Sequence, residues 1–168
     1  MRTKKLIYLT SAIIMLVFLW FPLKAAAQGL SGIGYNGFGV RAGLSGSPDQ
    51  VYGGIHVDLG EFHKDVRFRP SGELGFGDDR TVLQMLAEVH YVFSKYITWK
   101  PYLGAGVGLT HVNYDNHHRH GSDTGVSLSP IGGIETQLNP WMNFFAEVKL
   151  GLAHEDPDIK IAAGLTWK

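Results

Sequence analysis

Hydrophobic and polar residues alternate along most of this chain. In residues 66–76, Val66 and Phe68 fall on one face of an extended strand. The opposite face carries charged and small residues, namely Arg67, Arg69, Ser71, Glu73 and Gly75. Residues 83–93 and 142–152 follow the same rule. This period of two is typical of β-strands with one apolar face and does not fit a helix.

Eight such segments follow one another, each separated from the next by turn residues. Each has about ten residues, which is the length that a tilted strand needs to cross a bilayer. The pattern therefore predicts an all-β fold, an eight-stranded antiparallel up-and-down transmembrane β-barrel. The predicted strands cover residues 38–44, 51–59, 66–76, 83–93, 103–110, 126–135, 142–152 and 159–167.

The first 27 residues have the composition of an export signal. Arg2, Lys4 and Lys5 precede an apolar run over residues 6–23, and three alanines end the segment at Ala27. We therefore predict a cleaved signal peptide at residues 1–27 and an outer-membrane β-barrel domain at residues 28–168. The alternative is an uncleaved membrane anchor, because the apolar run approaches the length of a bilayer-spanning helix. Export with membrane insertion through strands predicts an outer-membrane location.

The polar faces of the predicted strands carry equal numbers of positive and negative side chains. An eight-stranded barrel has an interior just wide enough for side chains, so these groups can close it by pairing. We expect them to form a lumen charge network that closes the interior. In the alternative of a narrow channel, this network would have to open. The predicted members are Arg41, Asp58, Arg67, Arg69, Glu73, Glu88, Glu135, Glu147, Lys149 and Lys160. The opposite arrangement, with the apolar faces inside, would give a soluble periplasmic barrel that binds an apolar ligand.

Aromatic residues gather near the strand ends on the side where the chain begins, as expected for a membrane-interface girdle. The predicted girdle comprises Tyr35, Phe62, Phe93, Tyr96, Trp99, Tyr102, Trp141 and Trp167. With both termini on the periplasmic side, the longest predicted connection, residues 113–123, is extracellular. Residues 61–65 are predicted to be a periplasmic connection.

One segment resembles a known family. Residues 99–108 read Trp-Lys-Pro-Tyr-Leu-Gly-Ala-Gly-Val-Gly. They resemble the PYxGxGxG strand of the small outer-membrane β-barrel proteins of Gram-negative bacteria, the porin-like or opacity-like superfamily similar to the OmpA transmembrane domain. The resemblance covers about residues 34–168 and implies the barrel fold, with little information on activity. It also implies assembly by the barrel-insertion machinery, which reads a terminal aromatic residue; here Trp167 precedes Lys168.

Few residues suggest chemistry beyond the barrel itself. His117, His118 and His120 form the one dense group of candidate metal ligands, with a solvated polar loop as the alternative interpretation. The surrounding residues 113–123 are also the candidate site for an extracellular ligand. The chain has no Cys, which excludes thiolate metal centres. Without the four basic residues of the leader, 11 basic residues face 15 acidic ones, and this net charge of −4 argues against nucleic-acid binding.

The sequence therefore predicts a non-catalytic outer-membrane barrel with no cofactor, in a structural, surface-interaction or envelope-stability role. Its expected partners are outer-membrane lipid and lipopolysaccharide. The main alternative is a lipid-modifying enzyme of the lipid A deacylase or acyltransferase type, which needs a nucleophile beside a base. Strand parity places His111 on the lipid-facing side and Ser127 and Ser129 on the lumen side, which argues against that alternative.

Overall fold

The computed structural model describes residues 33–168 apart from positions 47–48, 78–79, 96–97, 117–118 and 154–156. Its strands are β1 (Gly37–Gly46), β2 (Gln50–Asp58), β3 (Glu61–His63), β4 (Val66–Gly77), β5 (Arg80–Val92), β6 (Trp99–Asn116), β7 (Arg119–Asn139), β8 (Met142–Leu150) and β9 (Ile159–Trp167). Among the described residues, no helix has the length and apolar character needed to span a membrane.

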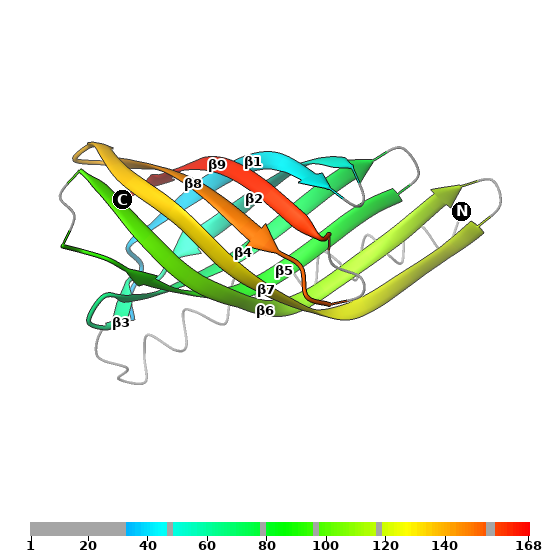
Figure 1. The fold of residues 1–168 in the computed structure, drawn as a ribbon, viewed down its shortest axis with the longest axis horizontal. Coiled ribbons are helices and arrows are strands. Elements are labelled where there is room, and N and C mark those ends of the chain that lie inside the picture. The colour runs from blue at the N-terminus through cyan, green and yellow to red at the C-terminus, as the bar shows by residue number, and fades with distance from the viewer. Residues whose placement is uncertain (1–32, 47–48, 78–79, 96–97, 117–118, 154–156) are drawn as a thin grey trace.

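The strands form a closed antiparallel barrel, which confirms the predicted fold class. Each long strand pairs with the next long strand along the chain, so β2 pairs directly with β4 although β3 lies between them in the sequence. Strand β1 pairs with β9, which closes the wall. Eight long strands therefore make the barrel, and each contains one of the eight predicted segments or most of it. Figure 1 shows these strands tilted around a common axis.

The connection predicted at residues 61–65 joins β2 to β4 and contains a short strand that the sequence analysis did not predict. Glu61 and His63 pair with Arg67 and Val66, so this segment forms the short strand β3. The tight turn back into β4 is made by Asp65, whose φ of 64° lies in the left-handed region that Asp tolerates better than most residues. All three residues of β3 are exposed, so neither of its faces is buried against the rest of the barrel.

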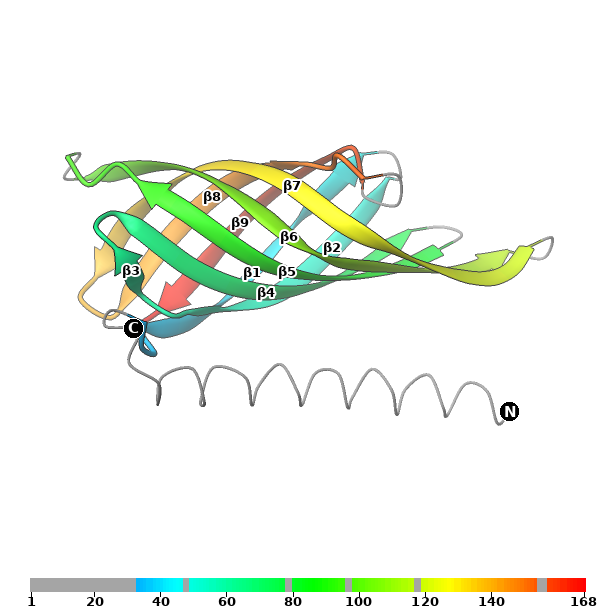
Figure 2. The same cartoon turned by 90° about the horizontal axis from the view of Figure 1, so that it is seen from below.

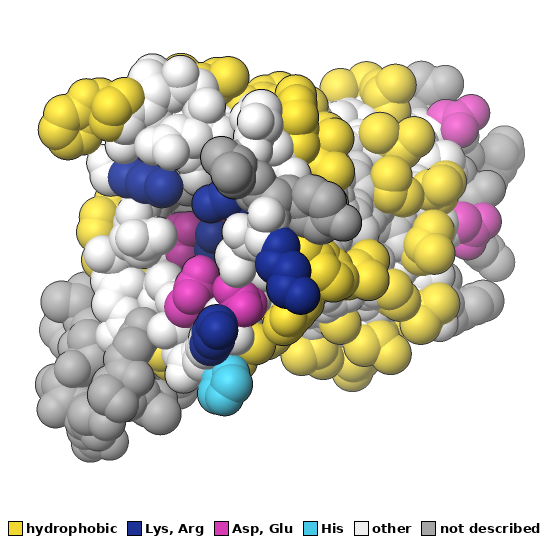
Figure 3. Space-filling model, turned by 60° about the vertical axis from the view of Figure 1, so that its left-hand side comes forward, with side chains coloured by type: hydrophobic (Ala, Val, Ile, Leu, Met, Phe, Trp, Pro, Cys, Tyr) yellow, Lys and Arg dark blue, Asp and Glu magenta, His cyan; other side chains and the backbone are white. Residues whose placement is uncertain are grey.

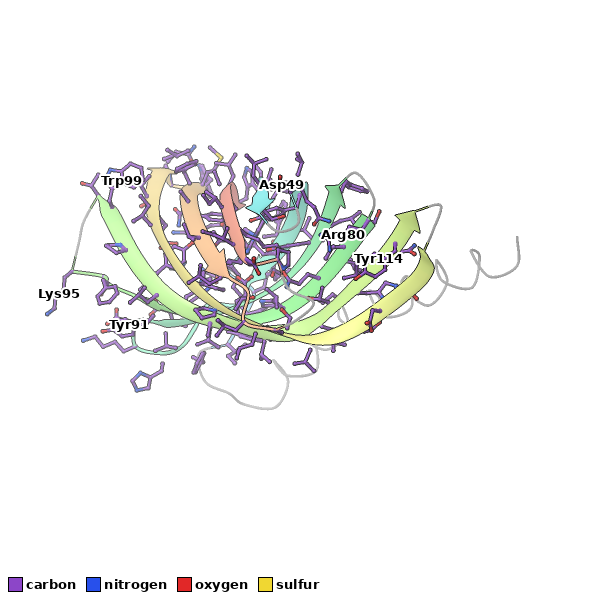
Figure 4. All side chains as sticks on the ribbon, turned by 45° about the vertical axis from the view of Figure 1, so that its right-hand side comes forward. Asp49, Arg80, Tyr91, Lys95, Trp99 and Tyr114 are labelled. Carbon is purple, nitrogen blue, oxygen red and sulfur yellow. The ribbon has the colours of Figure 1, made fainter. Side chains whose placement is uncertain are left out.

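The barrel has two different ends. We call the end that holds Lys168 and the β3–β4, β5–β6 and β7–β8 connections the terminal end, and the other end the distal end. In Figure 2 the terminal end lies on the left, with β3 at its rim. Labelled side chains mark both rims in Figure 4: Tyr91, Lys95 and Trp99 lie toward the terminal end, and Arg80 and Tyr114 toward the distal end.

Strands β6 and β7 extend beyond the distal end, so the predicted loop at residues 113–123 was wrong. The two strands pair without interruption up to Asn116 and Arg119. Strand β8 pairs with β7 only from Ile131 to Asn139, which leaves the tip of the hairpin outside the barrel wall. Figures 1 and 2 show this hairpin projecting past the neighbouring strands. Alternation is absent there because both faces of the projecting hairpin carry polar residues.

The outer surface of the barrel wall is apolar, whereas its interior is polar. Large apolar side chains on every long strand point outward and are exposed, for example Leu44 at 64%, Val107 at 54% and Ile161 at 58%. In Figure 3 hydrophobic side chains form a broad band across the visible face of the barrel, and most of the charged side chains in view gather at the terminal end. This distribution is the reverse of that in a water-soluble barrel with an apolar interior.

Candidate functional site: the charged lumen

Strand parity brings all ten predicted charge-network residues to the inner face of the barrel. Nine of them are buried, and Arg67 is partly exposed near the terminal end. They come from seven of the eight long strands, because each of those strands contributes at least one residue with the inward parity. The structure sorts the ten residues into two groups, one halfway along the lumen and one at the terminal end.

The first group, which we call the central cluster, is built around Arg41. One terminal nitrogen of its guanidinium donates to Glu73 at 3.2 Å, Glu88 at 3.0 Å and Glu147 at 2.7 Å. All four side chains have accessibilities of at most 1%. Because a buried charge without a partner is very costly, three carboxylates around one guanidinium require further cations.

Two lysines supply those cations. Lys149 Nζ donates to Glu73 at 2.5 Å and to Glu88 at 2.6 Å, and it lies 3.6 Å from Glu147. Lys160 Nζ donates to the second oxygen of Glu73 at 2.6 Å. The central cluster therefore contains three cations and three carboxylates, and its formal charge is zero.

Neutral polar side chains complete the hydrogen bonding around the central cluster. Ser71 donates to Glu88 at 2.7 Å, and the Tyr102 hydroxyl donates to Glu147 at 2.9 Å. On the distal side, Lys160 donates to Gln84, whose amide nitrogen in turn donates to Thr110 and Ser127 at 3.0 and 2.8 Å. The contact between Lys160 on β9 and Gln84 on β5 connects opposite sides of the lumen, and the others join adjacent or next-neighbour strands.

The second group, which we call the mouth cluster, lies at the terminal end. Arg67 and Glu135 form a bidentate pair with distances of 2.7 and 3.1 Å, and Asp58 lies 3.6 Å from Arg67 Nε. Arg69 is 3.6 Å from Glu135. This cluster has two cations and two carboxylates, so it is also formally neutral. It borders a cavity of about 420 Å³ that is lined by residues 34–36, Gly60, Glu61 and part of Arg67.

Two aromatic residues of the lumen were missed by the sequence analysis. Tyr102 was assigned to the membrane girdle, but its side chain is 1% exposed, stacks on His90 at 4.9 Å and points into the lumen. Phe145 is also 1% exposed and lies 5.6 and 5.2 Å from the guanidinium carbons of Arg41 and Arg69. Parity could have located both, because Tyr102 alternates with Leu103 and Phe145 with Phe144.

Glycines on the inner face give these large side chains their room. A methyl group at Gly133 would lie against the Tyr102 ring and 2.7 Å from the carbonyl oxygen of Ala146. A methyl group at Gly164 would meet the Phe145 ring, and one at Gly104 the ring of His90. The glycines therefore fit the lumen to the neighbouring aromatic residues, in agreement with their expected role as spacers.

The remaining girdle residues among those described lie near the terminal end with exposed side chains, including Tyr35, Phe62, Trp99 and Trp141. Trp167 stacks on Phe38 at 5.5 Å, and Trp99 meets Phe144 edge-on at 6.5 Å. Tyr96 lies outside the described residues. These aromatic rings encircle the end of the barrel where the described chain both starts and finishes.

The remaining candidate site residues are the histidines and serines outside the charge network. His117 and His118 lie outside the described residues, and so does the side chain of His120 on β7. Among the residues that are described, no group of three or more potential metal ligands is found. His111 shares the outward parity of Leu109, and its Nδ1 lies 2.7 Å from Thr124 Oγ1. Ser127 and Ser129 are buried on the lumen side. The structure therefore separates the histidine from both serines.

Comparison with solved structures shows which proteins share this fold. Neisserial surface protein A is similar with a TM-score of 0.61 and 17% identity, over 79% of this chain and 94% of that one. The N-terminal β-barrel domain of Pseudomonas aeruginosa OprF gives 0.59 and 19%, over 80% and 98%. The Yersinia pestis outer membrane protein Ail in a phospholipid bilayer nanodisc gives 0.51 and 12%, over 78% and 97%.

No protein-family model and no curated protein sequence matches the chain. At these identities the structural similarity establishes the fold alone. It confirms the predicted resemblance to the small outer-membrane β-barrels at the level of architecture, and the whole barrel takes part in it.

Proposed function

We propose that this chain is a non-catalytic outer-membrane β-barrel whose lumen is closed by ion pairs, and that it serves a structural, surface-interaction or envelope-stability role. The observation that carries the proposal is the contrast between the two faces of the wall. Ten charged residues lie inside in two neutral clusters, while aliphatic side chains outside have exposures of up to 65%. A membrane provides the solvent in which such an exterior is stable.

The proposed location implies a definite topology. The terminal end, with its aromatic girdle, faces the periplasm, and the β6–β7 hairpin projects from the cell surface. Surface contacts are therefore assigned to this hairpin, whose exposed polar residues include Ser122, Asp123 and Thr124. Lipopolysaccharide and phospholipid cover the apolar wall. The export signal at residues 1–27 and assembly by the barrel-insertion machinery belong to the same proposal.

The closed lumen and the absence of catalysis rest on two arrangements. The central cluster connects β1, β4, β5, β8 and β9 across the lumen with side chains that are almost completely buried, which supports a closed interior. His111 pairs with Thr124 on the outer face, and among the described residues no carboxylate is bonded to that histidine. A nucleophilic site would need such a carboxylate to orient the base.

The membrane location is tested by placing an arginine on the outer face at two depths. Val107 is outward-facing near the middle of β6, and Leu138 is outward-facing near the terminal end of β7. In lipid vesicles, Val107→Arg should cost about 2–4 kcal/mol of unfolding free energy and the matched Leu138→Arg about 0–1 kcal/mol. Equal, small effects of both substitutions, together with recovery of the protein in the soluble periplasmic fraction, would contradict the proposal.

The lumen and the catalytic question have separate tests. Planar bilayers containing the purified barrel should show no stable single-channel conductance, because the interior is filled by paired side chains. A lipid A mass spectrum from cells with and without the protein should be identical. Regular conductance steps would favour the narrow channel, and a gained or lost acyl chain would favour the lipid-modifying enzyme.

A further inference from the structure

Several rings gather around Arg69, which lies on β4 between Arg67 of the mouth cluster and Glu73 of the central cluster. We call this group the histidine layer; its members are His56 on β2, Arg69 on β4, His90 on β5 and Phe145 on β8. The guanidinium carbon of Arg69 lies 5.2 Å from the centre of the Phe145 ring, and the His56 ring lies 5.3 Å from the same centre. Strand pairing sets His90 diagonally across from Arg69, because Arg67 is its direct partner.

Several polar atoms in this layer are buried without a hydrogen-bond partner among the described residues. They are Nε and Nη1 of Arg69, Nδ1 of His56, and both ring nitrogens of His90. The three side chains are at most 2% exposed, so bulk solvent does not reach them. The carboxylates beside Arg69 are already engaged, since Glu135 pairs with Arg67, and Glu88 pairs with Arg41 and Lys149.

The unpaired atoms include both donors and acceptors. His56 Nε2 lies 2.9 Å from Thr166 Oγ1, and His90 Nε2 lies 3.4 Å from Glu88 Oε2. A neutral His90 carries one ring proton, so one of its two unpaired nitrogens is a donor and the other is an acceptor. Arg69 can only donate. A small anion could satisfy Arg69 but would be repelled by the acceptor nitrogen of His90, whereas water can accept from Arg69 and donate to that nitrogen.

We propose that the histidine layer is a binding site for internal water, which bridges the Arg69 guanidinium to Nδ1 of His56 and of His90. Buried water in proteins takes this role, making two to four hydrogen bonds to polar groups that the protein leaves unpaired. The inference goes beyond the proposed cellular role and holds for the barrel wherever it is located. It makes the lumen hydrated on the mouth side of the central cluster while that cluster remains cross-linked.

The test uses crystals of the refolded wild-type barrel grown in chloride and, in parallel, in bromide. The expected result is solvent density within hydrogen-bond distance of Arg69 Nε or Nη1 and of at least one histidine Nδ1, with no anomalous bromide peak beside Arg69. A bromide peak there would show that an anion occupies the site in place of water, and it would overturn the proposal. Absence of density at a resolution that reveals other ordered waters would overturn it as well.

A solution measurement gives an independent readout. In the ¹⁵N-labelled barrel in micelles, the Arg69 Nε–H proton should show magnetisation transfer to water, because the bridging molecule lies next to it. The assignment is made with Arg69→Lys, which removes that signal while it keeps a positive charge near Glu135. Absence of magnetisation transfer from the Arg69 Nε–H proton to water in the folded protein would contradict the proposal even if crystals were not obtained.

Discussion

At the residue scale, Glu88 shows how the central cluster depends on its charge balance. Its carboxylate accepts from Arg41, Lys149 and Ser71, so it is the partner of two buried cations at once. Breaking a buried ion pair by removing one partner is much more costly than replacing the whole pair with apolar groups, because an uncompensated charge stays behind. The stability of the cluster is therefore a property of its charge balance and not of any single hydrogen bond.

This dependence gives the first prediction. Glu88→Ala should lower the unfolding free energy by about 3–5 kcal/mol, because Arg41 and Lys149 lose a shared counter-charge. Urea titration of the refolded barrel, followed by the gel shift between folded and unfolded forms, measures the change. Asp49→Ala is the matched control; this carboxylate is exposed, and its removal should change stability by about 0.5 kcal/mol or less. Equal effects of the two substitutions would show that the buried network does not stabilise the barrel.

The strands that pack around Tyr102 give a second prediction, at the scale of the element. Gly133→Ala places a methyl group against the Tyr102 ring and the Ala146 carbonyl, and both β6 and β8 must shift to admit it. We expect a loss of about 1–3 kcal/mol, as for other overpacked interiors. Gly72→Ala is the control, because a methyl group there meets no atom within 4 Å. Equally small losses of unfolding free energy at both positions would mean that the lumen is not filled as described.

The projecting hairpin gives the third prediction. Distal to the Gln84–Ser127 hydrogen bond, β7 pairs with β6 through residues 119–126, and β8 pairs with β7 only from Ile131 onward. Replacing residues 115–120 by a two-residue Asn-Gly turn should therefore leave the urea midpoint of the barrel unchanged. It should also abolish cleavage by protease added to intact cells if the distal end is extracellular. A lower midpoint would assign the hairpin a role in folding.

How far the sequence alone predicted these elements depended on the surroundings of each strand. The eight membrane-length segments were predictable because an apolar exterior and a polar lumen impose alternation on every residue. The distal half of the β6–β7 hairpin lies outside that wall, so its polar residues gave no strand signal. In the lumen, charged members were predicted from parity, but Tyr102 and Phe145 were missed because aromatic residues also suit the membrane interface. Which carboxylate meets which cation depends on strand register and closure, which alternation does not specify.

At the scale of the whole molecule, the two ends of the barrel differ in charge as well as in aromatic content. Among the side chains that the structure describes, the distal end carries Asp49, Asp123 and Asp158, with Arg80 as the basic residue. At the terminal end, Lys64, Lys95, Lys100 and Lys168 exceed Glu61 and Asp65 in number. Because the lumen clusters are neutral, the net charge of the barrel is divided between its rims. The acidic rim should repel lipid phosphates unless cations bridge them.

Tryptophan position provides the fourth prediction, on how the molecule sits in lipid. Without the leader the chain has three tryptophans, Trp99, Trp141 and Trp167, and all lie at the terminal end. Because indole rings prefer the headgroup region, fluorescence should be quenched most by lipids brominated near the headgroup and least by lipids brominated near the chain end. Trp141→Phe, which removes the most exposed ring at 72%, should lower the emission and preserve this order. Stronger quenching by deep bromines would place the girdle inside the hydrocarbon and contradict the membrane boundaries implied by the apolar band.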